Sequence, residues 1–140
     1  MAAGWRRGWT RTTGSGKKYG NAKSEVDGEI FDSRKEARRY IELQWLLKAG
    51  TIKDLRRQVR FLLIPAQREP DIIGPRGGRK PGKLIEKEVA YVADFVYTDT
   101  ETGETVVEDV KGYKGGGAYA VFSLKRKLLL QLYGIRIKEV

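Results

Sequence analysis

Two short segments of the sequence place charged side chains where a strand normally carries apolar ones. In the segment EDVKG, residues 108–112, Asp109 and Lys111 are two positions apart, and side chains with that spacing share one face of a strand. A third charged residue, Asp94, lies in the preceding apolar segment. If the two segments form a hairpin centred on residues 101–102, Asp94 faces Asp109; a bulge in the turn would place it opposite Lys111 instead. In either register the three charges share one face of two neighbouring strands.

The two carboxylates create an electrostatic problem on that face. Asp94 is flanked there by Val92 and Val96, so it projects where the pattern predicts an apolar side chain. Two carboxylates about 4 Å apart repel by about 4 kcal/mol at an effective dielectric constant near 20. A divalent cation removes this repulsion, and an all-oxygen set is typical of Mg²⁺ or Mn²⁺. The alternative is a structural ion pair between Asp109 and Lys111 beside a second buried acid.

These residue types suit the hydrolysis of a phosphodiester. Asp94 and Asp109 would hold the metal, which activates a bound water, and Lys111 would stabilise the negative charge that develops in the reaction. Glu36 is a fourth candidate, because it lies on the inward stripe of a predicted helix and could complete the metal shell or orient the water. The segment SRKE, residues 33–36, also matches a capping box, in which Glu36 binds only the backbone of its own first turn.

The composition narrows the chemistry further. The chain has 140 residues, which suits one domain, with 40% hydrophobic and 33% charged residues. It contains no His and no Cys, which excludes imidazole bases, thiolate nucleophiles, disulfides and zinc sites built on these ligands. The formal net charge is +10, from 28 Lys and Arg against 18 Asp and Glu, and this favours a nucleic-acid partner. No segment suits a membrane span, so we expect a cytoplasmic protein.

The hydrophobic periodicity predicts a small α/β domain over residues 24–140. We expect a mixed sheet flanked by helices, in the order α-β-β-β-α-β. The expected elements are a helix over 33–49, strands over 56–64, 88–99 and 105–112, a helix over 119–133 and a strand over 135–140. Residues 65–83 contain all four prolines and several glycines, and this predicts a long basic loop.

Apolar spacing also predicts which side of each element is buried. The predicted inward residues are Tyr40, Leu43 and Leu47 on the first helix, Val59, Phe61 and Leu63 on the first strand, and Val121, Leu124, Leu128 and Leu132 on the second helix.

Cationic side chains outside the sheet are candidates for DNA contacts. Residues 1–23 carry six Lys or Arg and no acid, with aromatic residues between them, which suits phosphate contact and base stacking by a mobile arm. A solubilising tail has the same composition and is the alternative. The predicted DNA-binding residues are Arg6, Arg7, Arg11, Lys17 and Lys18 in this arm, and Lys125 and Lys127 on the second helix.

The motifs resemble those of the PD-(D/E)xK, or restriction-endonuclease-like, nuclease superfamily. The segment AYVAD ending in Asp94 and the Asp109-x-Lys111 pair match its bipartite motif, and Glu36 matches the acid that many members carry on the first helix. Ala93 stands where the superfamily has its name-giving proline, a residue without a chemical role.

The segments around these motifs are more closely similar to a small phage-encoded group of that superfamily with unassigned function, and in layout to the archaeal-type Holliday-junction resolvases. The resemblance implies a Mg²⁺-dependent homodimer, acting in the host cytoplasm, that cuts two strands of a four-way DNA junction symmetrically. Two other functions are compatible with the same residues: a nicking or flap endonuclease, and a nucleic-acid-binding module without cleavage.

Overall fold

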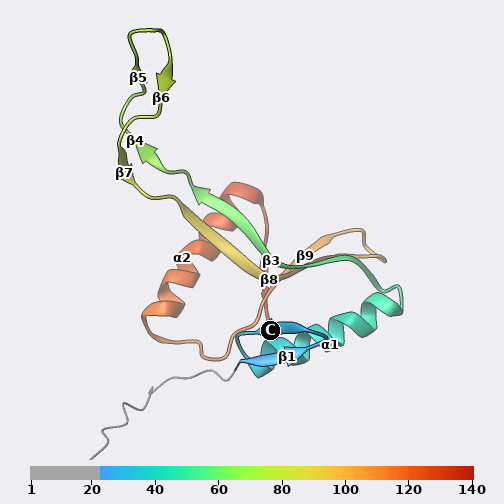
Figure 1. The fold of residues 1–140 in the computed structure, drawn as a ribbon. Coiled ribbons are helices and arrows are strands. Elements are labelled where there is room, and N and C mark those ends of the chain that lie inside the picture. Colours follow the sequence, from blue (N-terminus) through green and yellow to red (C-terminus); the bar gives the residue numbers. More distant parts are fainter. Residues whose placement is uncertain (1–22) are drawn as a thin grey trace, which may run out of the picture.

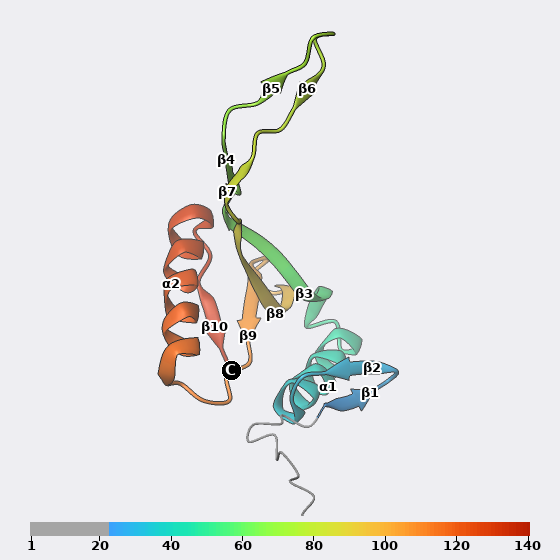
Figure 2. The same cartoon turned by 60° about the vertical axis from the view of Figure 1, so that its left-hand side comes forward.

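The structure is a computed structural model that describes residues 23–140, and its centre is a mixed sheet of four strands. The strands lie in the order β10-β9-β8-β3, with helix α1 packed on one face and helix α2 on the other (Figures 1 and 2). Their bounds are β3 Ile52–Ile64, β8 Val89–Asp99, β9 Thr105–Asp109, β10 Ile137–Glu139, α1 Arg34–Lys48 and α2 Gly116–Tyr133. The predicted α/β class with a mixed sheet is confirmed. Neither helix is long and apolar enough to span a membrane.

The β8–β9 hairpin adopts the first of the two predicted registers. Phe95 pairs with Glu108 and Val96 with Val107, which is the alignment expected for a turn centred on residues 101–102. Strand β3 pairs antiparallel with β8, and β10 pairs parallel with β9 through the α2 crossover. The two strands that carry the candidate acids, β8 with Asp94 at its middle and β9 with Asp109 at its end, are therefore neighbours in the middle of the sheet.

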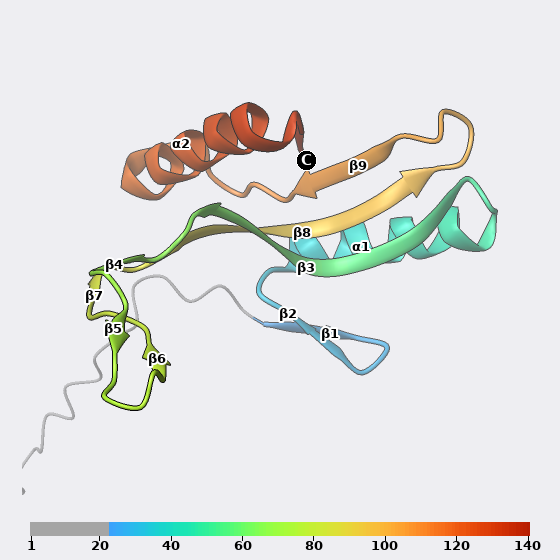
Figure 3. The same ribbon diagram turned by 90° about the horizontal axis from the view of Figure 1, so that it is seen from above.

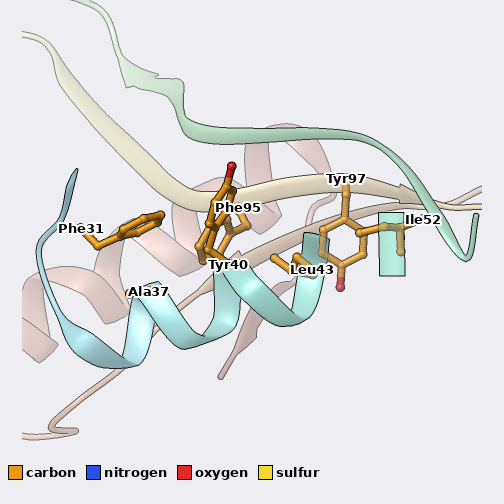
Figure 4. Close-up of a cluster of buried hydrophobic side chains, with 7 residues drawn as sticks. All are labelled: Phe31, Ala37, Tyr40, Leu43, Ile52, Phe95 and Tyr97. Carbon is orange, nitrogen blue, oxygen red and sulfur yellow. The ribbon is translucent and has the colours of Figure 1, made fainter. Parts of the chain in front are cut away.

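Helix α1 buries the predicted stripe. Ser33 caps its N-terminus by accepting the Glu36 backbone N–H at 3.1 Å, and Glu36, Tyr40 and Leu43 are buried against the sheet, with Leu47 half-buried. Figure 4 shows Tyr40 and Leu43 of the helix packed with residues of β8 and β3. The complete cluster is Phe31, Ala37, Tyr40, Leu43, Ile52, Phe95 and Tyr97.

A short hairpin before α1 was not predicted from the sequence. Strands β1 (Ser24–Val26) and β2 (Glu29–Phe31) pair antiparallel around a turn at Asp27 and Gly28. Phe31 is fully buried against Tyr40, with ring centroids 5.0 Å apart. The hairpin therefore extends the core on the α1 side of the sheet.

Helix α2 buries a different face from the predicted one. Phe122 and Leu129 are its buried side chains, Leu128 is half-buried, and Val121 and Leu124 are 55% and 61% exposed. Leu132 is also exposed. The apolar residues of this helix extend around more than one face, so periodicity alone does not identify the narrow strip that packs on the sheet.

The predicted loop at 65–83 is an extended two-stranded ribbon. We define the ribbon as residues 65–88, in which β4 (Gln67–Arg68) pairs with β7 (Leu84–Glu86) and β5 (Ile72–Ile73) pairs with β6 (Arg79–Lys80). It continues β3 and β8 well beyond the sheet and the helices (Figures 1, 2 and 3). Proline cannot donate to a ladder, and the four prolines of this segment keep each paired stretch very short.

A buried ionic network fastens α1 to β9. Glu108 is fully buried, and Arg39 binds it with two hydrogen bonds, from Nε at 2.8 Å and from a terminal guanidinium nitrogen at 2.7 Å. The Tyr97 hydroxyl donates to the same carboxylate at 2.6 Å, and Lys138 lies 3.2 Å away. The charge of Glu108 is therefore compensated from the helix and from both neighbouring strands.

We predict that Arg39→Ala lowers the free energy of unfolding by about 3 kcal/mol or more, because it leaves a buried carboxylate without its bidentate partner. Urea denaturation near neutral pH measures this loss. The matched control is Arg38→Ala at the exposed neighbouring position, which should change stability by less than about 0.5 kcal/mol.

The same pair predicts a pH dependence. Burial by itself would raise the pKa of Glu108, but the hydrogen bonds from Arg39 and Tyr97 outweigh it and hold that pKa below its usual value. Such a group stabilises the fold fully above its unfolded pKa of 4.5, and the contribution is lost as the pH falls through the lower folded value. The stability gap between wild type and Arg39→Ala should narrow on acidification; a constant gap would contradict the assigned role of Glu108.

Candidate functional site

The structure brings the four predicted site residues together. Asp94 lies in the middle of β8, Asp109 ends the adjacent β9, Lys111 follows two residues later, and Glu36 is in the first turn of α1. The Asp94 carboxylate is close enough to Asp109 to raise its pKa, and Gln58 of β3 links Asp94 to Glu36. The site is therefore assembled from three strands and one helix.

The alternation of side chains along β8 breaks at Asp94. Phe95 and Tyr97 pack in the cluster on the α1 side, whereas Tyr91 and Ala93 pack in the cluster on the α2 side. Ala93 and Phe95 are two positions apart and would share a face in a regular strand. The sheet therefore changes its covered face at the position of the candidate acid.

This break corrects one expectation about the surroundings of Asp94. Val96 is buried as predicted, but Val92 is 45% exposed, so the two valines do not flank Asp94 on a single buried face. The sequence pattern treats β8 as a regular strand with period two, and that period does not hold across Asp94.

Gln58 is a site residue that the sequence analysis missed. The β3–β8 register is unchanged on either side of it, so Gln58 stands opposite Asp94. Its φ is 50°, a left-handed conformation that costs a non-glycine residue about 1 kcal/mol or more. Its amide donates to Glu36 Oε1 at 3.3 Å and to Asp94 Oδ1 at 3.4 Å. Gln58 could have been identified only from its position opposite Asp94, and that position is known only when the β3–β8 register is known.

Hydrogen bonds hold the backbone that follows β9, at Val110 and Lys111. Asp94 Oδ2 accepts the Val110 N–H at 2.7 Å, which ties the first acid to the strand that carries the second. The Lys111 N–H donates to the Val140 carbonyl at 3.0 Å, and Lys35 Nζ donates to the carbonyls of Lys111 and Val140 at 2.6 and 2.8 Å. The position of Lys111 is thus fixed by α1 and by the end of the chain.

The surroundings of Asp109 disfavour its ionised form. Burial raises its pKa to about 7; Lys111 opposes this rise, and the neighbouring Asp94 carboxylate reinforces it. Lys111 forms an ion pair with Asp109, and its ammonium lies over the Phe122 ring, 3.6 Å from the centroid. Two carboxylates and the Lys111 ammonium therefore lie together here.

Glu36 faces the site and contributes a second raised pKa. Burial is the largest cause, the charges of Asp94 and Asp32 add to it, and the pKa reaches about 7. The predicted cap is present in part, since Ser33 accepts the Glu36 N–H, while the Glu36 carboxylate accepts from Gln58 on the sheet. Arg57 lies 3.9 Å from the same carboxylate. The Ser33 half of the predicted capping box is therefore present, and the Glu36 carboxylate is directed towards the sheet.

The cations predicted to bind DNA are distributed unequally. Lys125 lines a shallow hollow of about 300 Å³ together with Asp109, Lys111 and Phe122. Lys127, two residues further along α2, lines a separate hollow beside β10. The predicted arm residues Arg6, Arg7, Arg11, Lys17 and Lys18 lie outside the described part of the chain. Of the predicted DNA-binding residues that the structure describes, Lys125 is the one that shares a hollow with Asp109.

The donor set fits one hard cation with few protein ligands. Among residues 23–140, no three acidic side chains are close enough to form a metal-binding group. Asp94 and Asp109 do lie together, and Asp109 Oδ2 is buried, with Lys111 as the one cation that forms an ion pair with it in this range. Mg²⁺ commonly binds through one or two carboxylates, with water and substrate oxygens completing its shell. Of the three predicted ligands, Glu36 is joined to the pair through the Gln58 amide.

A comparison with protein families matches residues 16–138 of the chain, which therefore belongs to the family described as "Protein of unknown function (DUF1064)". No curated protein and no solved structure matches it. The family description names no activity, so the chemistry of the site must be argued from its residues.

We predict that Glu36→Gln stabilises the metal-free protein at alkaline pH. A carboxylate whose pKa rises from 4.5 to about 7 on folding loses its contribution to stability as the pH rises through the folded value. The glutamine cannot ionise, so the variant should gain on the order of 2 kcal/mol relative to wild type between about pH 5 and pH 8. Urea denaturation with a chelator across this pH range tests it.

The control is Glu104→Gln, which changes the same charge at an exposed position of the β8–β9 turn. It should show no comparable pH-dependent gain. An equal gain in both variants would mean that the net charge of the protein, and not the burial of Glu36, causes the effect.

Proposed function

We propose that this chain is a Mg²⁺-dependent, structure-selective endodeoxyribonuclease with a restriction-endonuclease-like core, acting as a homodimer on a four-way DNA junction. The observation that carries the proposal is the convergence of Asp94, Asp109 and Lys111 beside a hollow that also contains Lys125. The net charge of +10 supports a polyanionic substrate. Mn²⁺ would suit the same oxygen donors.

The residues divide the reaction between them. Asp94 and Asp109 would hold the metal ion, which on binding supplies an activated water and neutralises charge on the scissile phosphate. Lys111, held over Phe122 and tied at its backbone, would stabilise the negative charge that builds on the phosphate oxygens. A cation next to Asp109 would also favour its ionised form, which burial and Asp94 otherwise oppose.

Glu36 and Gln58 act behind this pair in the proposal. Gln58 donates to one oxygen of Asp94 and one of Glu36, so it fixes the orientation of both carboxylates. Glu36, with its raised pKa, could then accept a proton from a water at the site. Gln58 is a positioning residue here, because its own contacts are to the acids.

The assembly and the branched substrate follow from the proposed activity. Two symmetric cuts in a junction need two active sites related by a two-fold axis, and a homodimer supplies them. A nicking or flap endonuclease with the same site residues is the second candidate. A nucleic-acid-binding module is the third, and the intact Asp94, Asp109 and Lys111 favour an enzyme over it.

We predict that the wild-type protein cuts an immobile four-way junction in Mg²⁺ at paired symmetric positions, and that Asp94→Asn and Lys111→Ala each abolish cutting. End-labelled junction, flap, plain duplex and single strand should be compared side by side. DNA binding without metal should survive both substitutions, since they alter the reacting centre and leave the other cations in place. Lys48→Ala, at the exposed end of α1, is the control for loss of one positive charge.

The outcomes separate the candidates. Cutting of flap or duplex as efficient as that of the junction would retain the nuclease and reject the junction preference. Metal-dependent cutting that survives Asp94→Asn would reject the assigned site. DNA binding without cutting of any substrate would reject both nuclease proposals and favour the nucleic-acid-binding module.

We predict that Gln58→Ala raises the Mg²⁺ concentration needed for half-maximal cutting by about 10-fold, as expected for loss of a residue that orients metal ligands. The readout is the metal titration, because a purely structural role for Gln58 would leave the half-saturating concentration unchanged. Gln131→Ala, at an exposed position on α2, is the matched control.

A further inference from the structure

We infer that the ribbon, residues 65–88, is a DNA-binding element that grips the duplex next to the site. The inference rests on the proposed function only in taking DNA as the ligand. Binding of DNA by the ribbon does not require that the protein cuts it. It assigns a role to the part of the described chain that lies furthest from the sheet (Figures 1 and 3).

Hydrogen bonds join the two sides of the ribbon at several places between Gln67 and its tip. Between its short ladders, the Glu69 N–H donates to the Lys83 carbonyl at 2.9 Å, and Arg68 donates to the Gly82 carbonyl at 3.2 Å. A Cβ at Gly82 would lie 2.0 Å from the Glu69 carbonyl oxygen, so the strands approach there as closely as only glycine allows. The tip closes through the Gly74 N–H, which donates to the Gly78 carbonyl at 2.8 Å. These contacts give the ribbon a defined shape in which cations can be presented.

The outer part of the ribbon carries more positive than negative charge. Its cations are Arg76, Arg79, Lys80 and Lys83, and the acids on the opposite strand of this part are Asp71 and Glu69, the second of which lies opposite Lys83. All four are exposed, and the one acidic neighbour bound there is Asp71, which lies 3.1 Å from Arg79 and is itself exposed. An exposed pair of this kind contributes little to stability, so Arg79 can exchange it for a phosphate at little cost.

Three neighbouring hollows that share lining residues lie between the candidate site and the ribbon. The hollow that holds Asp109 and Lys111 shares Ala90, Val121 and Lys125 with a neighbouring hollow along β8. That second hollow shares Glu88 with a third at the base of the ribbon, where Arg68 and Lys87 are found. A duplex with its scissile phosphate at Asp109 can therefore follow β8 outwards to the ribbon cations.

DNA is the ligand that the ribbon suits best. Its apolar residues Ile72, Ile73 and Ile85 are well exposed, and apolar side chains on a two-stranded arm can wedge between base pairs while neighbouring cations hold the phosphates. An interface between two protein chains is normally depleted of lysine at its centre, and this surface is rich in cations. Association with a second copy of the chain through these isoleucines is the competing outcome of the test.

The test compares two variants that remove the same charge. The ribbon variant changes Arg76, Arg79, Lys80 and Lys83 to Gln; the control changes Arg38, Lys48, Lys53 and Arg56 to Gln, four exposed cations on α1 and the far end of β3. Binding of a fluorescent duplex and of a four-way junction is measured by anisotropy in EDTA over a range of NaCl concentrations. Urea denaturation checks that both variants are folded.

We predict that the ribbon variant loses about 10-fold or more in affinity, and that its slope of log affinity against log salt falls by about 3 to 4, close to 0.9 for each phosphate contact removed. The control should lose far less on both measures. Equal losses in the two variants would overturn the inference, because net charge alone would then explain binding.

A third variant, Ile72→Ser with Ile73→Ser and Ile85→Ser, tests the competing occupant by sedimentation. Conversion of an assembled protein to monomers with DNA affinity unchanged would also overturn the inference and make the ribbon a self-association surface. All binding is measured without metal, so these results do not depend on cleavage. If the ribbon variant loses DNA affinity but the wild-type protein cuts no substrate, the proposed nuclease activity is rejected and the DNA-binding role of the ribbon is retained.

Discussion

Two consecutive buried carboxylates on one short strand set the main constraint on this structure. Glu108 and Asp109 point to opposite faces of β9, and each needs a cation on its own side. Arg39 of α1 supplies the first with two hydrogen bonds, and Lys111 forms an ion pair with the second. The two adjacent acids of β9 thus bind a cation from α1 on one face and a cation from the segment between β9 and α2 on the other.

The two acids are compensated to different degrees. Hydrogen bonds from Arg39 and Tyr97 hold the pKa of Glu108 below its usual value, so this residue contributes to stability near neutral pH. Burial and Asp94 raise the pKa of Asp109 to about 7, and one lysine does not offset them. The Arg39–Glu108 hydrogen bonds hold β9 to α1 and stabilise the fold. This stability can offset the repulsion between Asp94 and Asp109 on the α2 side, as stable scaffolds commonly do for sites that are themselves destabilising.

The sequence predicted those features that depend on local pattern. The turn position limited the hairpin to two registers, of which the structure has the first, and the inward face of α1, including Glu36, followed from helical spacing. The buried face of α2 was predicted wrongly, because apolar residues around much of that helix leave the choice of Phe122 over Leu124 to the packing. Gln58 and the ribbon depend on the β3–β8 pairing, and such long-range contacts leave no periodic signal in either strand.

The same pairing relates the ribbon to the site. Strands β3 and β8 carry Gln58 and Asp94 opposite one another and then continue into the two sides of the ribbon. The break in alternation at these residues turns the covered face of the sheet from α1 to α2, the side on which the hollows lead outwards along β8. One antiparallel pair therefore sets both the orientation of the candidate acid and the direction in which the cationic ribbon projects from it. For the proposed nuclease, this arrangement would place Asp94 and the DNA-binding ribbon on the same pair of strands, so that a duplex bound by the ribbon lies beside the candidate acids.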